Sequence, residues 1–231
     1  MYPFLFSDLG NIKDYETFIS NTINNTQLKY SRISVDFHND IYKKVRHDLM
    51  NDTISSIWME LGLPRQKKIL VCQVYREWQY MDQPDDSSLS IPNQLLRWIE
   101  FLDQWERALN ENKEILVLGD INLNFLTWTK NVPTGSQAYR LRPLADQLFN
   151  KILPHGMTQC VTVPTRFWLG QEPSGLDHFY TNHPEKLSDV QVIFQGGSDH
   201  RLIFATRYSK SIVSWIFAPS IGAFIGKLVF Y

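Results

Sequence analysis

The stretch EILVLGDIN, residues 114–122, decides the fold. It is a short, continuous apolar run that ends in polar residues, which is the pattern of a β-strand covered on both faces. Apolar residues recur at helical spacing on either side of this run, and they predict one helix over 92–110 and a second within 139–153. We therefore expect a buried strand flanked in sequence by two helices.

Short runs rich in β-branched and aromatic residues make up most of the remaining chain, and Gly, Pro or polar residues separate them. Such runs are typical of strands. The strand candidates lie at 32–37, 53–61, 67–75, 160–165, 176–182, 190–194 and 201–207. Together with the two helices they predict a strand-rich α/β chain without an internal repeat.

Composition narrows the class of protein only in part. With 231 residues, 43% of them apolar, the chain can bury the core of one large domain. The 23 basic and 24 acidic residues leave a net charge of -1, which neither indicates nor excludes a polyanionic partner. Cys72 and Cys160 lie far apart without CxxC spacing, so neither zinc nor a disulfide framework is indicated. The start of the chain lacks the basic region of a signal peptide, and we expect an intracellular protein, nuclear or cytoplasmic, that is not secreted.

Asp120 and Asn122 lie at the end of the decisive strand. Two positions i and i+2 leave the same face of a strand, and open α/β sheets bind ligands at this end. A carboxylate and an amide there can hold a hard cation and orient a water molecule. A strand-ending turn would explain the same residue types, so the pair alone does not decide between the two interpretations.

Two later Asp-His pairs add candidate residues. Asp177 lies inside the predicted strand of SGLDHFYTN (174–182), and Asp199 and His200 lie in GGSDHRLIF (196–204), just before another strand. A buried carboxylate beside an imidazole fixes its tautomer and raises its basicity, so Asp177 could support His200. An Asp-His dipeptide is also common at the end of a polar loop. The functional interpretation therefore depends on the combination of motifs.

Five motifs follow one another in the chain, and in this order they resemble the endonuclease/exonuclease/phosphatase superfamily. The closest resemblance is to the endonuclease domain of non-LTR retrotransposons, and it covers roughly residues 31–208. The motifs are VYR (74–76), LGDIN (118–122), PTR (164–166), LDHFYTN (176–182) and GSDHRLI (197–203). The resemblance implies a DNase I-like, four-layer α/β sandwich of two mixed sheets flanked by helices. It also implies Mg2+ or Mn2+ as cofactor, DNA as substrate, and a reverse transcriptase domain as partner in the full element.

The resemblance further implies roles for individual residues. Asp120 would orient and deprotonate the attacking water, and Asn122 would hold the phosphate. His200 would contact the scissile phosphate while Asp177 holds its ring, and Tyr75 would stabilise nearby charge. The implied metal ligand is Asp199, and the implied substrate-binding residues are Arg76, Thr165 and Arg166.

The N-terminal part departs from this pattern, because no opening strand that ends in Asn precedes residue 31, nor is there a clear Glu motif. Glu16 in YETFI is either a substitute for that metal ligand or part of a tyrosine-containing loop of the family. We expect an N-terminally truncated domain with weakened or absent activity, since Mg2+ relies on few, well-placed carboxylates.

Three regions follow from these patterns: an irregular N-terminal segment (1–30), the nuclease-like domain (31–208) and a hydrophobic tail outside the domain (209–231). The tail is too short and too interrupted for a spanning helix, so no stable membrane partner is expected. Two other functions stay open, namely a phosphatase or phospholipid phosphodiesterase of the same superfamily, and an inactive nucleic-acid-binding module.

Overall fold

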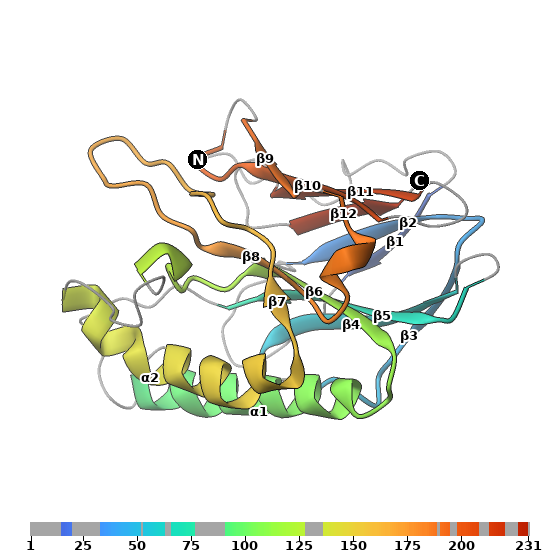
Figure 1. The fold of residues 1–231 in the computed structure, drawn as a ribbon, viewed down its shortest axis with the longest axis horizontal. Helices are drawn as coiled ribbons and strands as arrows, with labels where there is room; N and C mark the ends of the chain where they lie inside the picture. Colours follow the sequence, from blue (N-terminus) through green and yellow to red (C-terminus); the bar gives the residue numbers. More distant parts are fainter. Residues whose placement is uncertain are drawn as a thin grey trace.

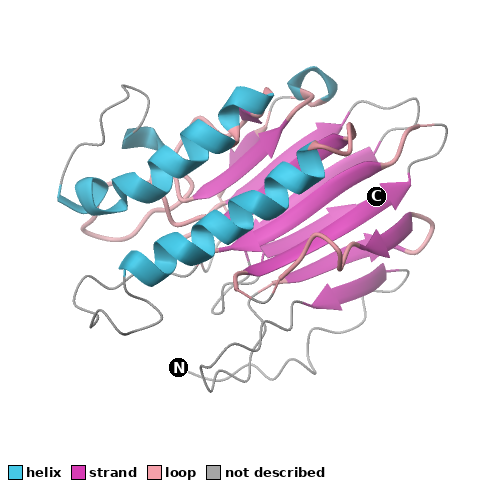
Figure 2. Cartoon of the chain, turned by 90° about the horizontal axis from the view of Figure 1, so that it is seen from below, coloured by secondary structure: helices cyan, strands magenta, loops and turns pink. Residues whose placement is uncertain are grey.

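Two β-sheets packed face to face form the body of the protein in a computed structural model of residues 1–231 (Figure 1). Two long helices cover the outer face of one sheet (Figure 2). The residues that the structure describes are 15–19, 33–51, 53–62, 66–76, 91–127, 136–188, 190–194, 198–207, 213–219 and 226–230. The two packed mixed sheets confirm the predicted α/β sandwich. Within the described residues the helices lie on one side only, so three of the four expected layers are seen.

The helix-covered sheet contains the decisive stretch as β6, Glu114–Asp120, with every residue buried. β6 lies inside the sheet, because it has a strand partner on each side: it pairs with β5 in parallel and with β8 in antiparallel. The order is β3 (Tyr42–Val45), β4 (Ser55–Gly62), β5 (Ile69–Tyr75), β6, β8 (Asp177–Thr181) and β7 (Thr158–Gln159). The expectation of a strand covered on both faces is confirmed.

Helix α1 (Ile91–Leu109) and helix α2 (Ser136–Lys151) lie close to the bounds that their apolar periodicity predicts. The inner face of α1 carries large rings onto the sheet, where Trp98 and Trp105 are fully buried, and α2 contributes the buried side chains of Leu144 and Leu148. The indole of Trp105 meets the Tyr180 ring edge-on, with centroids 5.2 Å apart. The indole N–H of Trp98 donates to the Leu144 carbonyl oxygen at 2.9 Å and so ties the two helices together. Short 3-10 helices of the described part of the chain lie at Phe125–Thr127, Leu153–His155 and Pro184–Lys186. No helix in the described ranges is both long enough and apolar enough to cross a bilayer.

The other sheet has the order β1 (Tyr15–Ile19), β2 (Ser34–His38), β12 (Gly226–Phe230), β11 (Val213–Pro219), β10 (Leu202–Arg207) and β9 (Gln191–Ile193). Only β12 and β2 pair in parallel. Its inner face and that of the helix-covered sheet form one apolar core, which includes Phe37, Leu118, Phe179 and Ile203. A second core lies between the helix-covered sheet and the helices.

Three expectations from the sequence differ from the structure. Residues 213–219 and 226–230, assigned to a tail outside the domain, pair their backbones with β10 and β2 inside the sheet. Residues 15–19, assigned to an irregular segment, pair with β2, while most of residues 1–30 lie outside the described part. The predicted strand at 160–165 is a loop, and Pro164 in it cannot donate a ladder hydrogen bond.

Gly119 allows β5 and β6 to pair closely just before the polar strand end. Its φ is +151°, and a Cβ at this position would lie 1.7 Å from the Val74 carbonyl oxygen. We expect Gly119→Ala to lower the free energy of unfolding by about 3 kcal/mol or more, because β5 must move away. Urea denaturation measures this loss.

Gly156→Ala is the matched control. Like Gly119, Gly156 has a positive φ, here +79°. A Cβ at Gly156, however, would meet no atom within 4 Å. Only conformational strain remains, and we expect a loss of about 1 kcal/mol. Equal losses for the two variants would contradict the steric explanation of Gly119.

Candidate active site at the end of the sandwich

Three candidate residues lie in one row across the helix-covered sheet. Tyr75 at the end of β5 pairs with Asp120 at the end of β6, and Asp120 pairs with Asp177 at the start of β8. Residues directly opposite one another on neighbouring strands point to the same face. Two positions along each of β6 and β8, Leu118 and Phe179 belong to the core between the sheets. The row is therefore the polar end of the inter-sheet core.

His200 reaches this row from the opposite sheet, immediately before β10. Its Nδ1 lies 2.8 Å from Asp177 Oδ2, and both side chains are buried. Ligand atoms of Asp120, Asp177 and His200 all lie within 4.8 Å of one another. Because the carboxylate of Asp177 accepts the hydrogen bond from Nδ1, it fixes the tautomer and the orientation of the His200 ring.

Burial and charge both perturb the acid–base properties of this cluster. Burial, with the repulsion from Asp177, raises the pKa of Asp120 to about 7. Burial alone would lower the pKa of His200, but the hydrogen bond and charge of Asp177, together with the charges of Asp120 and Asp199, raise it to about 9. Asp120 Oδ2 and Asp177 Oδ1 are buried and accept no hydrogen bond from any described residue. Such converging, unsatisfied carboxylate oxygens fit a hard divalent cation.

The chain after β6 turns sharply and brings Asn122 next to Asp120. Asn122 has a left-handed backbone, with φ of +53°, and its N–H donates to Asp120 Oδ1 at 3.0 Å. Its side-chain amide donates to the Arg76 carbonyl oxygen at 2.7 Å. The strand-ending turn and the candidate site are thus the same structure, and the two interpretations of this stretch do not exclude each other.

Arg76 and Thr165, expected to bind substrate, are both buried side chains bonded to the backbone. The guanidinium of Arg76 donates to the carbonyl oxygens of Ile121 and Asn122, at 2.5 and 2.7 Å. Thr165 Oγ1 accepts from the backbone N–H groups of Leu176 and Asp177, at 3.1 and 3.0 Å. Both residues hold the backbone beside the catalytic candidates.

Asp199, the expected metal ligand, lies next to the cluster but outside it. Its Oδ2 accepts from Arg166 Nε at 2.8 Å, so Arg166 meets a carboxylate of the protein rather than open solvent. The segment is fixed by backbone bonds between Phe167 N–H and Asp199 and between Arg201 N–H and Thr165. Glu16 forms an ion pair with Lys43 at 3.2 Å and is not part of the cluster.

The sequence profile of an endonuclease-reverse transcriptase family matches residues 69–204, more than half of the chain. This range contains the row of β5, β6 and β8 as well as His200. The chain belongs to this family. Among curated proteins, none matches the endonuclease-like chain significantly.

A solved endonuclease structure with a TM-score above 0.5 has the same fold as this chain. The endonuclease domain of TRAS1, a telomere-specific non-LTR retrotransposon, is 15% identical with a TM-score of 0.54, and the match covers 82% of this chain and 76% of that one. An AP endonuclease from Archaeoglobus fulgidus is 12% identical over 74% of this chain and 71% of its own, with a TM-score of 0.49. A 3'-5' exonuclease from Neisseria meningitidis is 14% identical over the same shares, also with a TM-score of 0.49.

His178 is a buried residue beside the candidate site that sequence reasoning did not select. Its Nε2 lies 2.7 Å from the Leu123 carbonyl oxygen and its Nδ1 lies 2.8 Å from the Tyr180 hydroxyl. A carbonyl only accepts, so Nε2 carries the proton and Nδ1 accepts from the hydroxyl. Burial lowers the pKa of His178 to about 4, so the ring is neutral. Its position one residue after Asp177 in a buried strand is the signal that could have found it.

The Asp177–His200 pair generates a prediction for the pKa of His200. In Asp177→Asn we expect this pKa to fall from about 9 to near or below its ordinary 6.5, because burial remains while the main partner is lost. NMR titration of the imidazole in metal-free buffer measures the change. Since the folded pKa lies above the unfolded one, the pair stabilises the fold fully below pH 6.5, and this stabilisation is lost as pH rises through 9.

Glu185→Gln is the control for this titration. Glu185 accepts from His183 at 2.8 Å in an exposed pair, so its removal should leave His200 unchanged. A pKa of His200 that stays near 9 in Asp177→Asn would show that Asp177 is not its main partner.

Proposed function

We propose that this chain is the DNA endonuclease domain of a retroelement and that it hydrolyses phosphodiester bonds with the aid of Mg2+ or Mn2+. The observation that carries the proposal is the convergence of Asp120, Asp177 and His200, from two sheets, at one end of the sandwich. Membership of the endonuclease-reverse transcriptase family supports DNA as the substrate class and a reverse transcriptase domain as the partner.

The residues proposed to hold the cation are Asp120 and Asp177, because ligand atoms of the two lie within 4.8 Å of each other and each has a buried oxygen without a hydrogen bond. Asp199 adds a third carboxylate, and because its Oδ2 is bound to Arg166, its other oxygen is the one open to the cation or its water shell. When bound, the cation would offset phosphate charge and lower the pKa of a water molecule. With only two carboxylates in the cluster itself, we expect weak Mg2+ binding and slow turnover.

The other side chains have proposed roles in binding and orienting the phosphate that follow from their charge and hydrogen bonds. At neutral pH His200 carries a proton, because its pKa is raised to about 9, and it can donate from Nε2 to a phosphate oxygen. Asp177 orients this ring through the Nδ1 hydrogen bond. Tyr75, in the same row, lies beside Asp120 and can add a donor for the developing charge.

Asp120 is the proposed base for the attacking water. Burial and Asp177 raise its pKa to about 7, which is close to the value that suits a general base at neutral pH. The water oxygen bonds to phosphorus, its proton passes to Asp120, and the bond to the leaving oxygen breaks. The Asn122 backbone N–H bond to Asp120 Oδ1 keeps that carboxylate in place. The Asn122 side-chain amide donates one hydrogen to the Arg76 carbonyl oxygen, and its second hydrogen can donate to the phosphate.

Plasmid nicking tests the proposal. We expect the wild-type chain to nick supercoiled plasmid slowly with millimolar Mg2+ or Mn2+ and not with EDTA. Asp120→Asn keeps the shape but removes the base, and we expect at least about a 100-fold lower rate. Asp103→Asn, which breaks an ion pair with Lys151 on the helix layer, should retain the wild-type rate.

The other outcomes have separate meanings. Release of phosphate from a soluble monoester without plasmid nicking would replace the nuclease by a phosphatase. Binding of DNA that is the same for wild type and Asp120→Asn, with no cleavage by either, would identify an inactive binding module.

A further inference from the structure

We propose that Arg76 is a positioning residue that holds the segment Asp120–Asn122 in its catalytic conformation from inside the protein. The inference rests on the proposed function of Asp120 and Asn122, and it assigns Arg76 a role that does not involve contact with DNA.

Arg76 is joined to three consecutive residues of this segment. Its backbone N–H donates to the Asp120 carbonyl oxygen at 2.9 Å. Its guanidinium donates to the carbonyl oxygens of Ile121 and Asn122. In return, the Arg76 carbonyl oxygen accepts from the Asn122 side-chain amide. Main chain and side chain of one arginine thus fix both the backbone and the side chain of the segment.

The segment needs such a partner because it leaves the sheet while still buried. Ile121 and Asn122 lie past the end of β6, and their carbonyl groups are no longer part of the ladder with β5. An unmade hydrogen bond in the interior costs about 1 to 3 kcal/mol for each group. Asn122 is also held in a left-handed backbone, which adds strain for a residue other than glycine. The planar guanidinium offers its donors in a fixed fork that reaches both carbonyl oxygens, whereas the ammonium group of a lysine is a compact point charge without this geometry.

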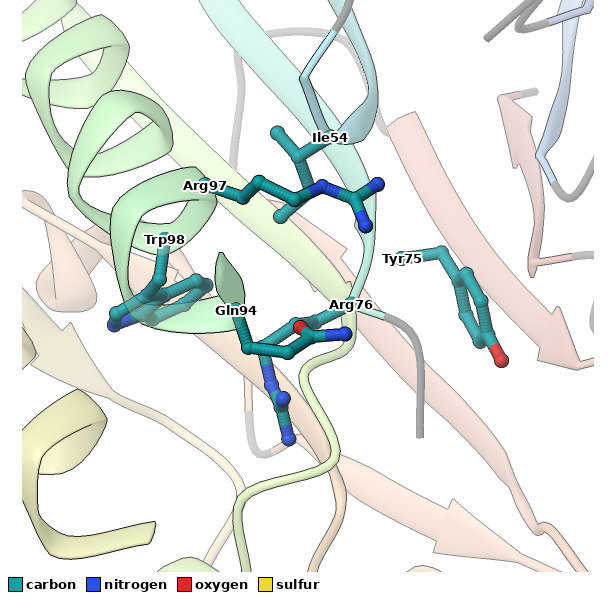
Figure 3. A pocket seen from close by; sticks show the side chains of 6 residues that line it. All are labelled: Ile54, Tyr75, Arg76, Gln94, Arg97 and Trp98. Atoms are coloured by element: carbon teal, nitrogen blue, oxygen red, sulfur yellow. The ribbon is translucent and has the colours of Figure 1, made fainter. Parts of the chain in front are cut away.

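The guanidinium lies away from the substrate side. Tyr75 and Arg76 extend in opposite directions from the end of β5, and Arg76 lies near Gln94 and Trp98 of α1 (Figure 3). Tyr75 contributes to the core between the sheets, where the active-site row ends. With 1% of its surface exposed, Arg76 cannot reach a DNA phosphate without leaving its carbonyl partners.

Arg76→Met tests this role, because it keeps much of the side-chain volume and removes every side-chain donor. We expect kcat for plasmid nicking to fall about 100-fold, since a small displacement of catalytic groups has this effect. KM, and the salt dependence of DNA binding in Ca2+, should stay within about twofold of wild type because no phosphate contact is lost. Arg76→Lys, which can reach one carbonyl, should recover part of kcat.

A double-mutant cycle separates positioning from general destabilisation. In the Asn122→Ala background, Arg76→Met should cost less than in the wild-type background, because the Asn122 side chain, one of the groups that Arg76 positions, is already gone. Arg97→Met is the matched control from the same pocket (Figure 3): Arg97 donates to the Thr53 carbonyl oxygen, away from the catalytic segment, and its loss should leave kcat unchanged.

Hydrogen exchange provides a readout that does not depend on DNA cleavage. We expect the peptide covering residues 119–125 to exchange faster in Arg76→Met and not in Arg97→Met. Faster exchange with an inactive wild type would support the positioning role and overturn the proposed function. Unchanged exchange, a KM that rises with the loss of about one unit of salt slope, or full activity of Arg76→Met would overturn the positioning role.

Discussion

The pairing of β6 with β8 places two carboxylates, Asp120 and Asp177, directly opposite each other at a buried strand end. Two ionised carboxylates at this distance repel each other, and burial adds to the cost. The imidazole of His200 offsets part of it by bonding to Asp177 from the other sheet. The register of β6 and β8 therefore imposes an electrostatic repulsion between the two carboxylates. A cation, alone or bound to a phosphate, is the kind of ligand that would reduce this repulsion.

Buried polar side chains hold the backbone around Asp120 and Asp177. The repulsion between the two carboxylates therefore does not distort the fold. Arg76 binds the carbonyls of Ile121 and Asn122, and His178 binds that of Leu123. Thr165 holds the N–H of Asp177 from the other direction. Each of these bonds satisfies a main-chain group that has left or not yet entered the sheet. The candidate catalytic side chains are thus supported by buried polar residues that bond to the main chain around them.

The sequence was most informative where a pattern is local. The run 114–120 predicted its own burial, and the order of five motifs predicted the family. Three residues of these motifs, Asp120, Asp177 and His200, lie close together in the structure. The sequence did not indicate which polar side chains point into the candidate site and which form hydrogen bonds with the main chain. Arg76, Thr165 and His178 lie in the same motifs as the catalytic candidates, and only three-dimensional contacts with buried carbonyl and amide groups distinguish their roles. The tail was also misjudged, because its strand partners lie far away in the sequence.

Those partners give the C-terminal strands a part in the site. Strand β11 pairs with β10, β12 pairs with β2, and β11 and β12 pair with each other. These two strands therefore join the two halves of the sheet whose strand β10 follows His200. Without it, β10 and β9 would form an isolated two-stranded ribbon, which is marginally stable at best. The hydrogen bond between His200 and Asp177 crosses from one sheet to the other, and it keeps its length only if both sheets hold their relative position. Strands β11 and β12 therefore contribute to the candidate site by supporting β10, the strand that follows His200, although the candidate site residues lie earlier in the chain.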